Sequence, residues 1–172
     1  MKILNLFGLL DEPDFTIRNE LLKYFNSIDI VSRRYKYETL DPNYIVENAC
    51  NKKYDLIVGA SVGGFFAGAI GSETNTRVIA INPTIPADLI IPKLAAEITG
   101  NEYAYTKELT ELSKQTNYNN VTAILGRSDE IVDHTVTAKY IKDHTYIDGG
   151  HFLSGKEFSD AFYKAIFKPK LN

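Results

Sequence analysis

The sequence predicts an α/β fold: a three-layer α/β/α sandwich around a mainly parallel, roughly six-stranded sheet, with a short helical lid. Two observations carry this prediction. Short runs of apolar, often β-branched residues alternate with longer segments of helical periodicity. The chain has 172 residues, 44% of them hydrophobic, which is enough for a sizeable core but short for two domains. We therefore expect residues 1–172 to form a single domain.

The expected elements alternate along the chain. Strands are expected at residues 2–7 (KILNLF), 29–34 (DIVSRR), 55–60 (DLIVGA), 77–82 (RVIAIN), 121–125 (VTAIL) and 144–148 (HTYID). Helices are expected at about residues 15–26, 42–52, 62–71, 88–97, 105–116, 134–141 and 155–167. Asp41 with Pro42, and Ser154, are good helix starts, because an Asp or Ser side chain accepts hydrogen bonds from the first backbone N–H groups.

The segment between the fourth and fifth strands is longer than a single crossover helix needs. It runs from Pro83 to Asn119. We expect a lid-like insertion at about residues 84–118. The sequence shows no internal repeat and no Gly-, Pro- or Ser-rich linker that would mark a domain boundary.

Charge and cysteine content narrow the class of function. There are 19 Lys and Arg against 22 Asp and Glu, which gives a net charge of −3. No run of basic residues is longer than a pair such as Arg33-Arg34. We therefore expect no nucleic-acid partner. The single cysteine, Cys50, allows neither an intrachain disulfide nor a thiolate metal cluster. The chain has no apolar run of about 18 residues, and its apolar start is too short for the core of a signal peptide. We expect a cytoplasmic protein with no membrane segment.

A serine lies at a glycine-rich turn between a strand and a helix. The run Gly59-Ala60-Ser61-Val62-Gly63-Gly64 spans the end of the third expected strand and the start of the next helix. A nucleophile elbow has this arrangement, because its serine takes a strained backbone conformation and small neighbours let helix and strand pack closely. The helix N-terminus then directs free N–H groups toward a developing oxyanion. The turn predicts Ser61 as a nucleophile.

A serine nucleophile needs a base, and the chain has three histidines, His134, His144 and His151. His151 follows the last strand on a loop at the carboxyl edge of the sheet, the same edge as Ser61. His144 lies near the opposite end of that strand and should be too far away. His134 opens a helix, where we expect a surface or capping residue. The pattern therefore predicts His151 as the base.

The acid that orients the imidazole should come from a neighbouring loop at the same edge. The loop after the fifth strand holds two adjacent carboxylates, Asp129 and Glu130. We predict Asp129, with Glu130 and Asp133 as alternatives. The order Ser61, Asp129, His151 is the chain order of nucleophile, acid and base in the α/β-hydrolases.

Two backbone N–H groups are expected to form an oxyanion hole. One belongs to Val62, and the other to Leu9, with Leu10 as the alternative. Gly8 permits the close approach of this loop. We expect the substrate pocket to include Gly8, Leu10, Phe65, Asn82 and Pro83. The apolar and aromatic content of the expected lid favours an uncharged acyl or aromatic group.

These motifs resemble those of the small YqiA-like esterases of the α/β-hydrolase superfamily, over nearly the whole chain. The resemblance rests on Leu6-Phe7-Gly8, the elbow at 59–67, Ile81-Asn82-Pro83, the segment 128–132 and Gly149-Gly150-His151-Phe152. It implies a triad of Ser61, Asp129 and His151, no metal or organic cofactor, and hydrolysis of short-chain carboxylic esters. The family usually has His-Gly where this chain has Phe7-Gly8, and often an additional polar residue between the glycine and the histidine, where in this chain Gly150 directly precedes His151.

Three functions could use a glycine-rich turn on this fold. The first is a serine hydrolase that acts on small acyl esters or thioesters through an acyl-enzyme. The second is a catalytically silent hydrolase fold that serves as a ligand-binding or protein-interaction module, which the altered Phe7-Gly8 loop favours. The third is a flavodoxin-like or nucleotide-binding domain, but the glycine spacing matches neither G-x-G-x-x-G nor a P-loop, and Asp129 and His151 would have no role. The sequence favours the first.

Overall fold

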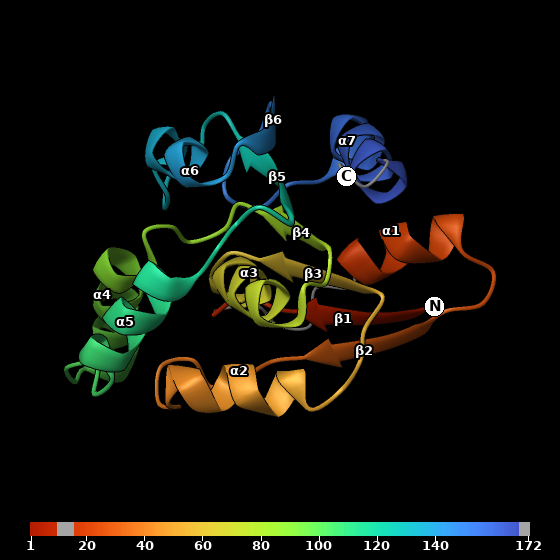
Figure 1. Cartoon of the computed structure of the whole chain (residues 1–172). Coiled ribbons are helices and arrows are strands. Elements are labelled where there is room, and N and C mark those ends of the chain that lie inside the picture. Colours follow the sequence, from red (N-terminus) through yellow and green to blue (C-terminus); the bar gives the residue numbers. More distant parts are fainter. Residues whose placement is uncertain (10–15, 169–172) are drawn as a thin grey trace.

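The structure of the chain is a computed structural model that describes residues 1–9 and 16–168, and it contains one six-stranded parallel sheet (Figure 1). The strands are Lys2–Leu6 (β1), Asp29–Arg33 (β2), Leu56–Ala60 (β3), Val78–Ile81 (β4), Val121–Gly126 (β5) and Asp143–Ile147 (β6). Every strand boundary agrees with the sequence prediction to within a single residue. The predicted α/β class is confirmed.

Helices lie between successive strands, and a last helix follows β6, as predicted. They are Thr16–Tyr24 (α1), Pro42–Cys50 (α2), Val62–Thr74 (α3), Ala87–Thr99 (α4), Thr106–Gln115 (α5), His134–Tyr140 (α6) and Gly155–Phe167 (α7). Asp41 caps α2 by accepting a hydrogen bond from the N–H of Asn43 at 2.8 Å, and Pro42 is the first helical residue. Ser154 precedes α7 as expected, but its side chain makes no capping hydrogen bond.

Two apolar cores, one on each face of the sheet, make the three layers. Successive residues of a strand point to opposite faces. In β1, Leu4 packs in the core that includes α2 and α3, whereas Ile3 packs in the core that includes α1 and α7. Figure 1 shows α1 and α7 on one side of the sheet and α2 and α3 on the other. Burial on both faces explains why the strands are almost continuously apolar.

The strand order places a crevice at the carboxyl edge of the sheet. The order is β2-β1-β3-β4-β5-β6. After β1 the chain adds β2 on one side, and it then adds β3 and the later strands on the other side of β1. In such sheets, ligands bind outside the carboxyl ends of the strands where the direction reverses, which here lies between β1 and β3. Leu6 pairs with Gly59, and Ala60 with Ile81, so the loops after β1, β3 and β4 begin close together.

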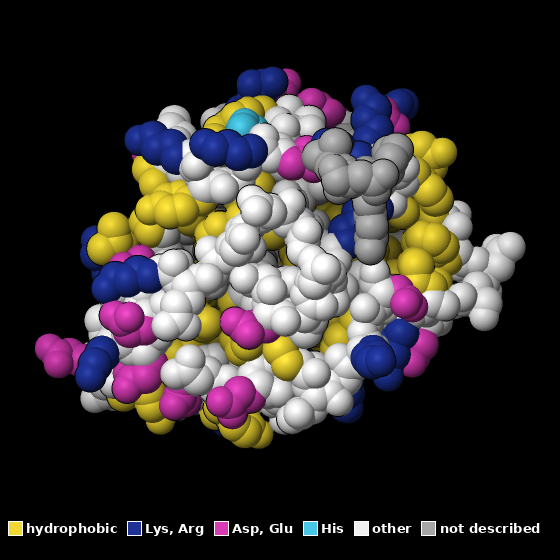
Figure 2. All heavy atoms as spheres, in the orientation of Figure 1, with side chains coloured by type: hydrophobic (Ala, Val, Ile, Leu, Met, Phe, Trp, Pro, Cys, Tyr) yellow, Lys and Arg dark blue, Asp and Glu magenta, His cyan; other side chains and the backbone are white. Residues whose placement is uncertain are grey.

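The segment between β4 and β5 contains two helices, α4 and α5, which lie side by side at one flank of the sheet (Figure 1). That this segment acts as a lid, and that the chain is a single domain, stay predictions. On the face shown in Figure 2, positive and negative side chains are interspersed, and hydrophobic side chains gather on the side of α1 and α7. Within residues 1–9 and 16–168, no helix is long and apolar enough to cross a membrane.

Candidate active site

Ser61 occupies the sharp turn between β3 and α3. Its backbone has φ 53° and ψ −123°, a conformation that L-residues rarely adopt. Its carbonyl oxygen accepts hydrogen bonds from the N–H groups of Gly64 and Phe65, which start the helix. The strained turn predicted from the glycine pattern is therefore present, and it presents the Ser61 side chain at the carboxyl edge of the sheet.

The glycine two residues after Ser61 is required by a close backbone approach. A Cβ atom on Gly63 would collide with the carbonyl oxygens of Leu6 and Phe7, at the end of β1. A Cβ atom on Gly59 would in turn collide with the carbonyl oxygen of Gly63. Absence of side chains at these two positions thus lets α3 begin directly against β1 and β3.

Replacing Gly63 by Ala is expected to destabilise the fold by about 1–3 kcal/mol, because the backbone of β1 cannot move away cheaply. Urea unfolding followed by circular dichroism measures the change. Gly100→Ala is the comparison: no atom lies within 4 Å of a Cβ there, so only its positive φ contributes, at about 1 kcal/mol. A Gly63→Ala protein no less stable than Gly100→Ala would contradict the packing argument.

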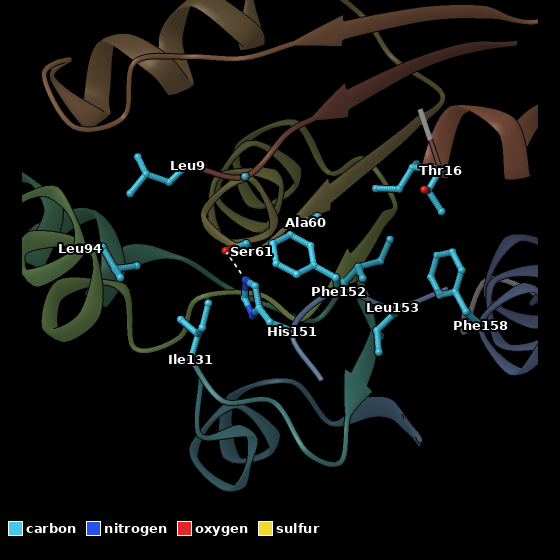
Figure 3. Close-up of a pocket in the computed structure, with 13 residues that line it drawn as sticks. Leu9, Thr16, Ala60, Ser61, Leu94, Ile131, His151, Phe152, Leu153 and Phe158 are labelled. Atoms are coloured by element: carbon cyan, nitrogen blue, oxygen red, sulfur yellow. Dashed lines mark hydrogen bonds between the residues drawn. The ribbon is translucent and has the colours of Figure 1, made fainter. Parts of the chain in front are cut away.

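The structure brings together three side chains from three loops. His151 Nε2 lies 2.9 Å from Ser61 Oγ, as the dashed line in Figure 3 marks. His151 Nδ1 lies 3.0 Å from Asp129 Oδ2 and 3.1 Å from Asp129 Oδ1. The three residues follow β3, β5 and β6, respectively. These contacts form a continuous hydrogen-bonded chain from hydroxyl to imidazole to carboxylate.

The Asp129 carboxylate is buried and fully engaged. Its side chain is 1% exposed. Oδ1 accepts the backbone N–H groups of Ile131 at 2.8 Å and Val132 at 3.0 Å. Burial by itself raises the pKa of Asp129, but the hydrogen bonds from His134, His151 and the two N–H groups outweigh it, so the pKa lies well below its ordinary value. Asp129 is therefore ionised at neutral pH.

The two alternative carboxylates make other contacts. Glu130 Oε2 accepts the backbone N–H of His151 at 3.0 Å, and so holds the loop of that residue and not its ring. Asp133 is the N-cap of α6 and accepts the N–H of Thr135 at 2.9 Å. Among the three carboxylates considered from sequence, Asp129 is the one that contacts the imidazole of His151.

The other two histidines, His144 and His134, make contacts in different parts of the structure. His144 pairs with Ala123 within the sheet, and its Nδ1 donates to the carbonyl oxygen of Ile141 at 2.8 Å, away from Ser61. The expectation that His134 is a surface or capping residue is wrong. Its side chain is 3% exposed, and its Nε2 lies 2.8 Å from Asp129 Oδ2. It is buried because the loop after β5 folds back and brings the start of α6 against Asp129.

A pocket with a mainly apolar wall opens at Ser61 and His151 (Figure 3). Gly8 and Leu9, from the loop after β1, contribute to its wall. Figure 3 shows Leu94 and Ile131 on one side of the Ser61–His151 pair, and Phe152, Leu153 and Phe158 on the other. Helix α4 supplies Leu94, and α7 supplies Phe158.

Three residues predicted to contact substrate lie elsewhere or outside the described chain. Phe65 is fully buried and packs edge-on against Phe66 in the core, because its position on α3 faces the sheet. Pro83 is buried against α3, where its Cβ would lie 2.9 Å from a Cβ on Gly64. Neither is part of the pocket wall. Leu10 lies outside the described residues.

Asn82 was also predicted to contact substrate, but it braces the loops of the site. Its Nδ2 donates to the carbonyl oxygens of Gly150 at 3.0 Å and His151 at 2.8 Å, and its Oδ1 accepts the N–H of Gly126 at 2.7 Å. Backbone groups therefore occupy both the donor and the acceptor of the side-chain amide, and the residue is 1% exposed. Asn82 ties the end of β5 to the histidine loop.

Sequence reasoning missed two kinds of site residue. Thr84 is fully buried, with its Oγ1 3.5 Å from Ser61 Oγ and its N–H donating to the Ser61 carbonyl oxygen at 3.0 Å. Ile17 and Phe158 line the pocket from α1 and α7. An apolar helix residue that faces a pocket has the same sequence signal as one that faces the core. In the described chain, His, Cys, Asp and Glu form no group of three or more that could hold a metal ion.

Several solved structures share this fold at low sequence identity. A protein of Xanthomonas campestris pv. campestris assigned to the alpha/beta superfamily of hydrolases superposes with a TM-score of 0.62 at 11% identity, over 96% of this chain and 97% of that one. The esterase domain of a Rhodothermus marinus protein gives 0.62 at 16% identity, over 96% and 83%. YbtT, a type II thioesterase from the yersiniabactin biosynthetic pathway, gives 0.55 at 10% identity, over 96% and 91%. These likenesses show the α/β-hydrolase fold.

The sequence comparisons give the family. No curated protein matches the chain. The model of the uncharacterised protein family UPF0227 matches residues 32–164, from the end of β2 into α7. This match covers well over half of the sequence, and the chain therefore belongs to the UPF0227 family, the YqiA-like family that its motifs resemble.

Proposed function

We propose that the protein is a serine hydrolase of the carboxylesterase or thioesterase type that acts on small acyl substrates. The observation that carries the proposal is the hydrogen-bonded chain from Ser61 through His151 to Asp129, at 2.9 Å and 3.0 Å. Ser61 also lies on a strained turn at the N-terminus of α3. Activated serine nucleophiles have this combination of geometry and electrostatics.

In the first half of the reaction, Ser61 Oγ attacks the substrate carbonyl carbon while His151 Nε2 accepts the hydroxyl proton. The resulting oxyanion accepts hydrogen bonds from the backbone N–H groups of Val62 and Leu9. Val62 is the first residue of α3, where N–H groups have no acceptor within the helix. The bond from carbon to the leaving oxygen or sulfur then breaks, and His151 protonates the leaving alcohol or thiol.

In the second half, water attacks the acyl-enzyme carbonyl and gives a proton to His151. Collapse of the tetrahedral intermediate releases the carboxylic acid and returns the proton to Ser61 Oγ. Asp129 stays ionised throughout, since its pKa lies well below the ordinary value, and it stabilises the imidazolium of His151. The fold supplies these groups on three fixed loops, so little reorganisation is needed during the reaction.

The pocket wall supports an uncharged, apolar acyl group as the bound part of the substrate. Around Ser61 the wall consists mainly of aliphatic and aromatic side chains, including Leu9, Leu94 and Phe158. Burial of an acyl chain against them is favourable by about 0.8 kcal/mol per CH₂ group. A charged acyl group would lose its hydration without gaining a partner.

A fluorophosphonate probe tests the proposal directly. We expect one adduct at Ser61 in the native protein, found by peptide mapping. Labelling disappears in Ser61→Ala and falls sharply in His151→Ala, because the probe needs an activated hydroxyl. Ser154→Ala is the matched control: Ser154 is exposed and makes no capping hydrogen bond, so its labelling is unchanged. Absence of labelling, together with no turnover of short p-nitrophenyl esters or acyl thioesters, would favour a ligand-binding module instead.

Phe152 offers a test of substrate binding separate from chemistry. Its side chain lies in the pocket wall next to His151 and is 68% exposed. Phe152→Ala is expected to raise KM for apolar acyl esters about three- to tenfold with little change in kcat, because it removes apolar area that substrate covers. Steady-state kinetics over a series of acyl lengths measure this.

Tyr44→Ala is the control for Phe152→Ala, since Tyr44 is a similarly exposed aromatic residue on α2, outside the pocket wall. Its kinetics should equal those of the native protein. An unchanged KM in Phe152→Ala for every acyl length would show that substrate lies elsewhere in the pocket.

A further inference from the structure

The carboxylate of Asp129 lies between two histidine rings. Its Oδ2 is 2.8 Å from His134 Nε2 and 3.0 Å from His151 Nδ1. A serine–histidine–acid mechanism uses one of these rings, and His134 is not among the residues that line the pocket at Ser61. Its side chain is 3% exposed. The reaction steps proposed above give no role to the buried His134 ring, although it binds the carboxylate of Asp129.

Both ring nitrogens of His134 have hydrogen-bond partners. Nδ1 lies 3.2 Å from Thr137 Oγ1, and the same hydroxyl lies 3.2 Å from the carbonyl oxygen of Ile85. An ionised carboxylate can only accept hydrogen bonds, so the 2.8 Å contact with Asp129 Oδ2 places a proton on Nε2 of His134, and this N–H donates to Asp129.

Building on the proposed function, we propose that His134 is a positioning residue: it holds Asp129 Oδ2 in place and draws part of the carboxylate charge away from His151. Oδ1 is already held by the N–H groups of Ile131 and Val132. His134 therefore completes the set of donors, and the carboxylate has one orientation in which both oxygens are satisfied. The ring of His151 then faces a carboxylate that has a fixed orientation and a partly dispersed negative charge.

The sign of the effect follows from charge sharing. A hydrogen bond to a carboxylate disperses its negative charge, and less of it remains to stabilise a neighbouring imidazolium. Without His134, Oδ2 would face only the ring of His151. His151 would hold its proton to higher pH, and the fraction able to accept the Ser61 proton at mildly acidic pH would fall.

Other charged or titratable groups surround this cluster, and the contacts given next do not involve the His134 ring. Glu130 binds the backbone N–H of His151 at 3.0 Å. The Tyr146 hydroxyl donates to the carbonyl oxygen of His134 at 2.9 Å. Arg127 lies over the Tyr146 ring and pairs with Asp148 at 3.2 Å, and Asp133 binds Thr135. A shift caused by His134→Phe thus reports on the ring that was removed.

Nuclear magnetic resonance suits this test, because the chain has three histidines. The ring Cε1–H signals are followed against pH in the native protein, His134→Phe, His134→Gln and His144→Gln. In His134→Phe we expect the titration midpoint of His151 to rise by about half a unit or more. The acid limb of the kcat/KM profile should move by the same amount, with KM changed less than about twofold. His134→Gln keeps an N–H donor and should move both values back toward native, and His144→Gln is the control.

A folded His134→Phe protein with an unchanged His151 midpoint and acid limb would overturn the proposal. If that variant does not fold, the native protein still decides: long-range ¹⁵N–¹H spectra should show Nε2 of His134 protonated across the pH range, and an unprotonated Nε2 would overturn it. The His151 midpoint and the protonation of His134 Nε2 are both measured by magnetic resonance and do not depend on turnover. Loss of the hydrolase proposal would appear instead as absence of fluorophosphonate labelling in the native protein.

Discussion

Replacing Ser61 by Ala is expected to lower kcat/KM for short p-nitrophenyl esters by about 10⁴-fold or more. The expectation follows from geometry: the hydroxyl that the variant lacks lies 2.9 Å from His151 Nε2, and no acyl-enzyme can form without it. His151→Ala should lose a similar factor, because a serine hydroxyl without a base is a weak nucleophile. Stopped assays with a chromogenic ester measure both losses.

The double variant makes this prediction sharper. Residues that act as one unit give losses that do not add. Ser61→Ala combined with His151→Ala should therefore be about as slow as either single variant, at the residual rate that the oxyanion hole and binding support. Losses that multiply, or a Ser61→Ala protein with native turnover, would show that the two residues do not share a step. Ser154→Ala should retain native kinetics.

Asp129→Asn should lower kcat about 10³- to 10⁴-fold, with KM nearly unchanged. The carboxylate accepts the Nδ1 proton of His151 at 3.0 Å, which keeps the lone pair on Nε2 toward Ser61. An amide in its place removes the negative charge and favours the wrong tautomer of the ring. The pKa of Asp129 lies well below its ordinary value, so this carboxylate should supply its charge over the whole pH range of activity.

Glu130→Gln is the matched control, one residue away. Its carboxylate accepts the backbone N–H of His151 at 3.0 Å, and a glutamine oxygen can accept the same bond, so kcat should fall less than about threefold. Comparison of kcat for the two variants, with circular dichroism to establish folding, identifies the acid. A dominant loss at Glu130 with a small one at Asp129 would reverse the assignment.

The strands and the turn at Ser61 could be predicted because the residue patterns that specify them are local in the sequence. Each strand is a short apolar run, and all six were placed to within a residue. A parallel sheet collects the loops that follow its strands at one edge. That rule alone was enough to expect Ser61, Asp129 and His151 near one another, although they are far apart in the sequence. The turn at Ser61 was likewise readable from glycines that allow α3 to approach β1.

Side-chain direction within the site was not readable in the same way. Asp129 and Glu130 are adjacent carboxylates with the same sequence signal, yet one binds the ring of His151 and the other its backbone. Asn82 follows β4 at the right edge, but three backbone groups from other loops occupy its amide. Phe65 faces the core and not the pocket. For Asp129, Glu130 and Asn82 the hydrogen-bond partners belong to other loops.

The sequence by itself determined the layers, the strand positions and the carboxyl edge at which Ser61 lies, because hydrophobic periodicity and turn residues act locally. The tertiary structure decided which groups touch across that edge. It buried His134 against Asp129 at 2.8 Å, where the sequence predicted a surface or capping residue, and it formed the pocket from α1, α4 and α7 together. The physical reason is that hydrogen bonding and packing between loops depend on where separate segments meet, which no local pattern encodes.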